Sequence, residues 1–214
     1  MNKTASPPQQ TILPLAVLLA GVYIGAQMLA DIASLKIGLV AGLAVDMGTF
    51  IYPITFTMRD LVHKALGKKA ARTIVLTATG INVFMALYLW AAAMVPAAPD
   101  WPLQAQFHAV LAPVWRIVLA SILAELVSEL LDTEIYSWYV RRTRRHQWGR
   151  VLLSNLLALP VDNLIFCIGA FGWTLPWAAV WQIFLANLAV KFIASAVGTP
   201  LIYLIPSRFE SDDI

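Results

Sequence analysis

The sequence predicts an all-α integral membrane protein, a bundle of six transmembrane helices. Of its 214 residues, 60% are hydrophobic and 13% are charged, whereas soluble domains carry about 25% charged residues. The mean hydropathy is +0.74. The apolar residues also form runs of about 20, the length at which a helix crosses the hydrocarbon core of a bilayer. These observations exclude an ordinary soluble domain.

The predicted spans follow one another along the chain. Residues 1–11 are polar and contain two prolines, so we expect a disordered N-terminal tail. Residues 12–206 are expected to form a single transmembrane domain, and residues 207–214 a polar C-terminal tail. A signal peptide is the alternative for the first run, but that run is long and no cleavage site of the usual kind follows it. The expected spans are Ile12–Ala30, Gly48–Leu66, Thr73–Val95, Val114–Tyr139, Val151–Phe171 and Trp177–Ile205.

The segment Leu35–Asp46 between the first two spans is too short to cross a membrane and too apolar for an exposed loop. We expect an interfacial or re-entrant segment that packs against the bundle, because irregular backbone at membrane depth must be buried in protein or line a cavity. In the first span, Gly21 and Gly25 have the G-x-x-x-G spacing that allows helices to approach closely. A homodimer is therefore one expectation, although a chance spacing is equally compatible.

Basic residues predict the orientation. They concentrate in the connections after the second and fourth spans, whereas the connections after the third and fifth spans contain no lysine or arginine. Cytoplasmic loops carry this excess, so both termini are expected in the cytoplasm and the protein in the cytoplasmic (inner) membrane. The positive net charge thus reflects topology, and no nucleic-acid partner is predicted. The basic residues are Lys64, Lys68, Lys69, Arg72, Arg141, Arg142, Arg144, Arg145 and Arg150.

Charged and amide side chains recur inside the predicted spans. Glu125, Glu129 and Asp132 are spaced four and three residues apart, so they share one helical stripe. Such groups are expensive inside a membrane and usually face the interior. Two interpretations are open: structural bridges between helices, or a midplane site for a small polar solute. The other polar residues are Arg59 and Asp60 in the second span, Asn155, Asp162 and Asn163 around Pro160 in the fifth, and Gln182, Asn187 and Lys191 in the sixth.

The sequence lacks the common catalytic motifs, so an enzyme is not favoured. The sequence contains no H-E-x-x-H, G-x-S-x-G or P-loop motif, and its three histidines lie in different segments. The single Cys167 lies in an apolar run and predicts neither a disulfide nor a metal site. No cofactor is predicted. A solute carrier is the function class that this pattern favours.

Several stretches resemble one known family. They are Gly48-Thr49-Phe50-Ile51-Tyr52-Pro53-Ile54-Thr55-Phe56 with Asp60 and Gly67-Lys68-Lys69-Ala70-Ala71-Arg72; Ala120-Ser121 with Asp132 and Ile135-Tyr136; Arg150, Ser154, Asp162, Phe166 and Ala170-Phe171-Gly172; and Lys191 with Thr199-Pro200 and Tyr203. In order and spacing, this set is similar to the queuosine-precursor transporters, which are also grouped as a vitamin-uptake-like family. The resemblance runs from about Gly48 to Pro206.

The resemblance implies import of a 7-deazaguanine for tRNA modification: 7-cyano-7-deazaguanine, 7-aminomethyl-7-deazaguanine or queuine. One carboxylate can accept the paired N–H donors of a guanine-like edge, while a neighbouring donor binds the carbonyl oxygen. The candidate acceptors are Asp60, Glu125, Glu129, Asp132 and Asp162, of which Asp60, Asp132 and Asp162 match the family pattern. The candidate donors are Arg59, Asn155, Asn163 and Lys191, and the candidate aromatic contacts are Tyr52, Phe56, Phe166 and Phe171.

The sequence departs from the family pattern at Arg59, Lys64, Leu66, Glu125 and Glu129, and these departures bear on the identity of the solute. Alternating access driven by protons and facilitated diffusion are both compatible with the residues. Two rival functions are a substrate-binding membrane subunit that works with separate energising partners, and an assembly protein whose buried charges only join helices.

Overall fold

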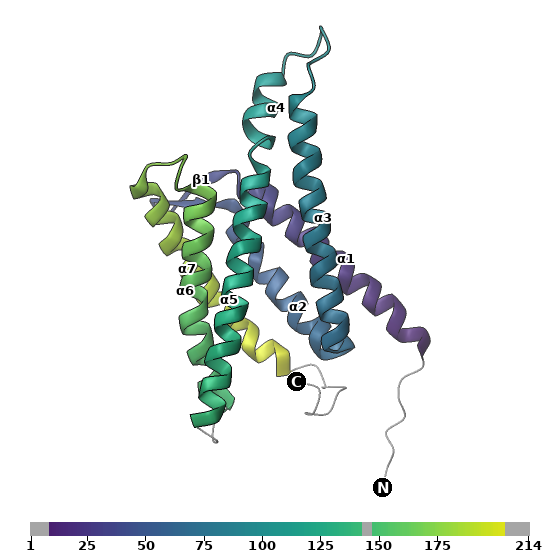
Figure 1. The fold of residues 1–214 in the computed structure, drawn as a ribbon, viewed down its shortest axis with the longest axis vertical. Coiled ribbons are helices and arrows are strands. Elements are labelled where there is room, and N and C mark those ends of the chain that lie inside the picture. The colour runs from purple at the N-terminus through teal and green to yellow at the C-terminus, as the bar shows by residue number, and fades with distance from the viewer. Residues whose placement is uncertain (1–8, 143–146, 204–214) are drawn as a thin grey trace.

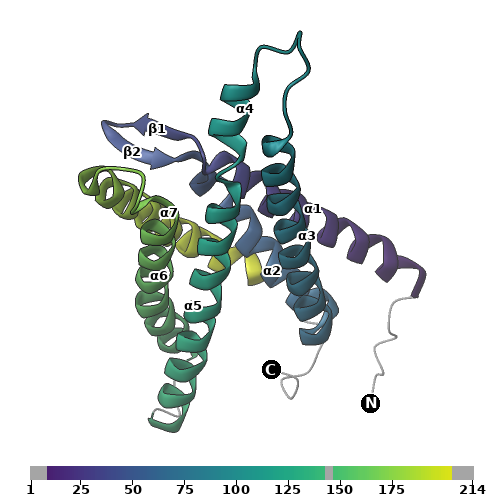
Figure 2. The ribbon, with the colours of Figure 1, turned by 45° about the horizontal axis from the view of Figure 1, so that its top comes forward.

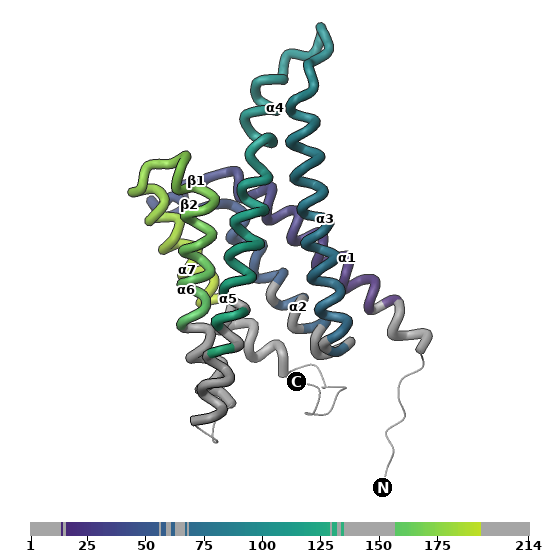
Figure 3. The backbone as a smooth tube through the Cα atoms, viewed as in Figure 1, coloured from purple at the N-terminus to yellow at the C-terminus, as the bar shows by residue number. Residues whose placement is uncertain are grey.

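The protein is mostly helical in the computed structural model, which describes residues 9–142 and 147–203 (Figure 1). Figure 3 shows the same path of the backbone as a smooth tube. A helix lies in each of the six predicted spans, and α4 is a further short helix in the expected loop after the third span. The first helix begins inside the expected N-terminal tail. The helices are α1 (Gln9–Ala33), α2 (Tyr52–Leu66), α3 (Lys68–Met94), α4 (Gln104–Leu111), α5 (Val114–Arg142), α6 (Gln147–Phe171) and α7 (Trp177–Tyr203).

The segment between α1 and α2, where the sequence predicts an interfacial or re-entrant stretch, adds two strands to the expected all-α fold. This segment forms an antiparallel β-hairpin of β1 (Ile37–Val40) and β2 (Leu43–Asp46). Its two-residue turn has positive φ at both positions, 50° at Ala41 and 81° at Gly42. Turns of this kind match the twist of two-residue hairpins. Gly42 adopts this conformation readily, because glycine has no Cβ.

The hairpin packs against α7. This confirms the prediction that the segment packs against the helix bundle. Figure 2 shows β2 lying beside the N-terminal half of α7, with β1 paired to β2. The backbone N–H of Ala44 donates to Oε1 of Gln182 at 3.0 Å. A 3-10 helix, η1 (Met47–Phe50), then leads from β2 into α2. Gly48 of η1 lies against α1, where a Cβ would collide with Oγ of Ser34 and the carbonyl oxygen of Ala30.

Three apolar clusters hold the helices together. The largest joins α5, α6 and α7 and includes Ile117, Phe166 and Ile183. The second, which we call the Met85 cluster, joins α3 and α5 through Met85, Ala86, Val114 and Val118, and Met28, Leu35 and Ile122 pack against it. The third joins α1, α2 and α3. Gly169 brings α6 so close to α5 that a Cβ would lie 2.9 Å from Cβ of Ala120.

Long apolar helices mark this chain as a membrane protein. Within the part of the chain that the structure describes, three segments are long and apolar enough to cross a bilayer: Ala16–Ala33, Lys69–Met94 and Gln104–Ser128. Leu157–Phe171 and Trp177–Ile193 are shorter apolar helices. Large apolar side chains point outward from these helices, as lipid contact requires. They include Val17, Leu18, Leu76, Phe84, Leu126, Leu130 and Ile193.

Figure 1 shows how the helix ends are distributed. The turn between α2 and α3 lies at the same end as the start of α1, the end of α5 and the end of α7. The loop between α3 and α4 extends in the opposite direction. A Cβ added to Gly21 or Gly25 of α1 would have no heavy atom of another element within 4 Å. None of the described helices therefore packs on these two glycines. The homodimer stays a prediction.

Candidate functional site

An ion pair lies between α6 and α7, with its lysine buried and its aspartate partly buried. Nζ of Lys191 lies 2.6 Å from Oδ2 of Asp162, and the two side chains are 4% and 16% exposed. Asp162 follows Pro160 by two residues, inside α6. The hydroxyl of Ser128 on α5 lies 3.5 Å from Oδ1 of Asp162, and it also donates to the carbonyl oxygen of Glu125 at 3.0 Å. The structure thus brings together two of the predicted site residues and pairs them.

Aromatic rings cover one side of this ion pair. Nζ of Lys191 lies 5.2 Å from the centre of the Tyr52 ring, which is within the range of a cation–π contact. Tyr52 meets Phe166 edge to face, with ring centres 6.1 Å apart, and Phe166 meets Phe171 at 5.7 Å. The Tyr52 side chain also hydrogen-bonds to Ser121 of α5. Residues of α2, α5, α6 and α7 therefore meet around the pair.

Asn163, a predicted substrate donor, lies between α6 and α7. Its Nδ2 donates to the backbone carbonyl of Phe184 on α7 at 2.7 Å, and its Oδ1 lies 3.9 Å from Sγ of Cys167. The side chain is fully buried. An amide whose donor is occupied by main chain joins helices, so in this conformation Asn163 links α6 to α7.

A second polar cluster anchors the hairpin, and the sequence analysis did not include its centre among the site residues. Oδ1 of Asp46 accepts from the Ser34 hydroxyl at 2.8 Å and from the Thr49 backbone N–H at 3.1 Å. Oδ2 accepts from Nδ2 of Asn187 at 2.5 Å. The Thr49 hydroxyl lies 2.8 Å from that Oδ2 and 2.5 Å from Oδ1 of Asn187, and with one proton it donates to one of them at a time. Asp46 is therefore well satisfied, and it joins α1, β2, η1 and α7.

Asp31, near the end of α1, is a second buried acid among the described residues that was not predicted as a site residue. Its side chain is 1% exposed, and its Oδ1 has no hydrogen-bond partner. Glu125 on α5 interacts with it electrostatically, as does Tyr52. Asp31 stands at the end of an apolar run, where an acid reads as the boundary of a span. Asp46 carries a clearer signal, because an aspartate three residues before Thr49 is typical of an N-terminal helix cap.

Several predicted site residues have side chains outside the described part of the structure. Their backbones lie in α2, α5 and α6, but the positions of their side chains are not assigned. They are Phe56, Arg59, Asp60, Glu129, Asp132 and Asn155. Their predicted roles stay predictions.

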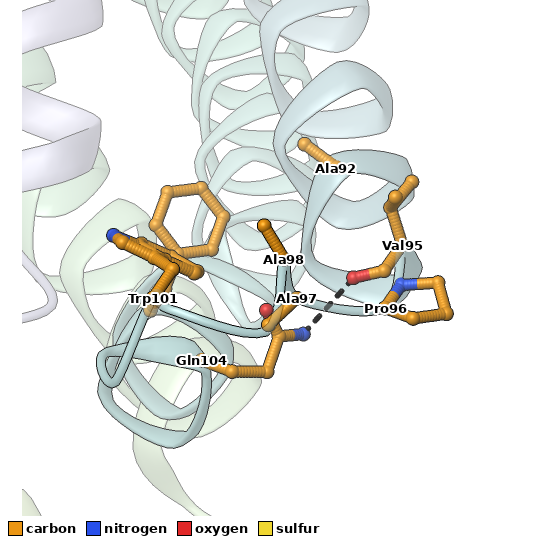
Figure 4. A pocket seen from close by; sticks show the side chains of 8 residues that line it. Ala92, Val95, Pro96, Ala97, Ala98, Trp101 and Gln104 are labelled. Carbon is orange, nitrogen blue, oxygen red and sulfur yellow. Dashed lines mark hydrogen bonds between the residues drawn. The ribbon is translucent and has the colours of Figure 1, made fainter.

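A recess of about 270 Å³ lies away from these polar groups, at the loop between α3 and α4. Figure 4 shows Gln104 directed toward the end of α3, where its Nε2 donates to the carbonyl oxygens of Val95 at 3.2 Å and Ala93 at 3.0 Å. Trp101 packs edge to face on Phe107 beside it. The amide donors are thus used to hold the loop, and apolar side chains form the rest of the lining.

The fold and the site together define a helical integral membrane protein with paired charges, amides and aromatic rings in its interior. Residues 46–205 match a family model described as "Putative vitamin uptake transporter". The chain belongs to this family, which is one of transporters and not of enzymes. The matched residues begin at Asp46 and include the Asp162–Lys191 pair and Tyr52.

One curated relative is a Bacillus subtilis (strain 168) protein named "Probable queuosine precursor transporter". It is 26% identical over 197 residues, which cover 90% of this chain and 85% of the relative. No solved structure matches the chain. The family that the sequence motifs suggested is thereby confirmed, together with a small-molecule substrate and a membrane setting.

Proposed function

We propose that this protein imports a queuosine precursor, a 7-deazaguanine, across the cytoplasmic membrane through six spans with both termini inside. The observation that supports this most directly is the buried Asp162–Lys191 pair beside Tyr52, in a chain related to a protein named for that substrate. A guanine-like solute offers N–H donors, a carbonyl acceptor and a flat ring. Carboxylates, Lys191 and the rings of Tyr52 and Phe166 complement these three features.

In the proposed mechanism, the solute approaches the pair from the outer side and binds beside it. Its carbonyl oxygen then competes with Asp162 for the Lys191 ammonium group. The α6 helix contains Pro160, which removes one backbone hydrogen bond two residues before Asp162. A helix weakened there can change shape as the site opens to the other side, which is how alternating access works around a midplane site. Asp60, Asp132, Glu129, Arg59, Asn155 and Phe56 are proposed to complete the site.

Uptake by the purified chain tests this proposal. We expect liposomes that contain only this protein to accumulate labelled 7-cyano-7-deazaguanine or 7-aminomethyl-7-deazaguanine, and Asp162→Asn to abolish that uptake. Asp100→Asn, at an exposed loop position, is the matched control and should transport normally. Binding without transport would support instead a binding subunit that needs energising partners. Normal transport of a deazaguanine by the Asp162→Asn variant would remove the pair from the mechanism.

A further inference from the structure

We propose that Asp31 is the group that accepts the paired N–H donors of the solute. The inference rests on the proposed function and adds a residue that lies before the matched family segment, which begins at residue 46. It starts from an unsatisfied atom: Asp31 is 1% exposed, and its Oδ1 has no hydrogen-bond partner. A buried acceptor without a partner is unfavourable, because it has lost the hydrogen bonds that water would supply.

The charges around Asp31 do not compensate it. Lys191, the buried cation of the described site, is already 2.6 Å from Asp162. The group that faces Asp31 from α5 is Glu125, whose charge has the same sign, and the group that faces it from α2 is the Tyr52 phenol. No described residue donates a hydrogen bond to Oδ1 of Asp31. A ligand with an N–H group could supply that donor.

A second buried acceptor lies in the same region. Oδ1 of Asn82 on α3 also has no partner, and this side chain is 5% exposed. Asn82 precedes Met85 by three residues, Asp31 follows Met28 by three, and both methionines belong to or pack on the Met85 cluster. The two orphan oxygens thus border the place where α1, α3 and α5 meet. Two buried acceptors without partners suit a ligand that offers N–H groups.

The acid that meets the solute is then Asp31 and not Asp162. A guanine-type edge presents a ring N–H beside an exocyclic amino group, and a carboxylate accepts both at once. Asp162 has Oδ2 on Lys191 and Oδ1 at 3.5 Å from the Ser128 hydroxyl, whereas Oδ1 of Asp31 has no hydrogen-bond partner. Tyr52 interacts with both acids, so a flat ring against Tyr52 can reach Asp31 with one edge while Lys191 meets its carbonyl.

The test compares ligands with and without the amino group on the detergent-purified full chain. The probes are 7-cyano-7-deazaguanine and its analogue that lacks the 2-amino group, and the readout is the ratio of their dissociation constants. We expect the wild-type protein to prefer the amino compound by roughly tenfold or more, as a charge-assisted hydrogen bond implies. Asp31→Asn should bring the ratio close to one, because an amide presents a donor to one of the two N–H groups. Asp100→Asn should keep the wild-type ratio.

A ratio unchanged in the Asp31→Asn variant overturns the assignment. If that variant does not fold, Asp31→Glu decides: the assignment expects weaker binding of the amino compound alone, and an equal change for both compounds overturns it. Guanine and hypoxanthine separate this inference from the proposed function. An Asp31-dependent preference for guanine, without binding of any deazaguanine, supports Asp31 and overturns the deazaguanine substrate. If the protein takes up a deazaguanine but does not prefer ligands with the 2-amino group, the result supports the proposed function and overturns the role of Asp31.

Discussion

At the scale of single residues, the interior of this protein handles its charges in two ways. Asp162 and Lys191 neutralise each other, with Tyr52 covering the ammonium group. Asp31 has an oxygen without a partner and an acid, Glu125, as its neighbour. A lone charge deep in a membrane costs about 2.5–3.5 kcal/mol on insertion scales. The paired acid is therefore suited to hold the helices, and the unpaired acid is suited to receive a ligand.

The ion pair makes a prediction about stability. Lys191→Met leaves the partly buried carboxylate of Asp162 without its cation, and losses of about 3–5 kcal/mol are typical when one partner of a fully buried pair is deleted, so we expect a loss toward the lower end of that range. We expect the double variant Lys191→Met/Asp162→Asn to recover most of this loss, because it removes both charges. Thermal or denaturant unfolding of the purified variants measures the difference. Equal stability of the single and double variants would show that the two charges do not interact.

At the scale of elements, the hairpin and η1 form a connector that joins α1 to α7. Asp46 accepts hydrogen bonds from Ser34, the residue that follows α1, and from η1 and α7. Gly48 is the residue that lets η1 approach α1. Because these contacts converge on one short segment, changes there should affect the packing of two helices that are far apart in the sequence.

Glycine substitutions test this connector. Gly48→Ala places a methyl group against Oγ of Ser34 and the carbonyl of Ala30, and overpacking of this kind typically lowers stability by about 1–3 kcal/mol. Gly80→Ala on α3 is the matched control, because a Cβ there meets nothing within 4 Å. Alanine is also the better helix former, so the control should be neutral or slightly stabilising. Melting temperatures of the two variants check the prediction; a Gly48→Ala protein as stable as the control would contradict it.

The sequence predicted the helices better than the connections between them. Apolar runs of about 20 residues locate helices, since length and hydropathy are local properties. The hairpin was not predicted, because its turn at Ala41-Gly42 contains none of the asparagine or aspartate signals that usually mark one. The Asp162–Lys191 pair could be anticipated as one of the helix bridges. Asp31 could not be predicted as a site residue. Its surroundings come from α2 and α5, and the spacing of residues within α1 gives no information about them.

At the scale of the whole molecule, the distribution of helix ends agrees with the charge pattern. The turn between α2 and α3 carries Lys68 and Lys69, and it lies at the end where α5 and α7 also finish. The loop between α3 and α4 lies at the opposite end and contains no lysine or arginine. Because positively charged loops stay on the cytoplasmic side, we expect the end with Lys68 and Lys69 to lie in the cytoplasm.

Cysteine labelling measures this orientation directly, because the only native thiol, Cys167, is 1% exposed. In a Cys167→Ala background, we expect a membrane-impermeant maleimide to label Ala97→Cys in intact spheroplasts, since that position lies in the exposed loop after α3. Lys69→Cys, at an exposed position near the start of α3, should react only after the membrane is permeabilised. The reverse pattern would invert the predicted topology, and then the Asp162–Lys191 pair would be approached by the imported solute from the end at which α5 and α7 finish.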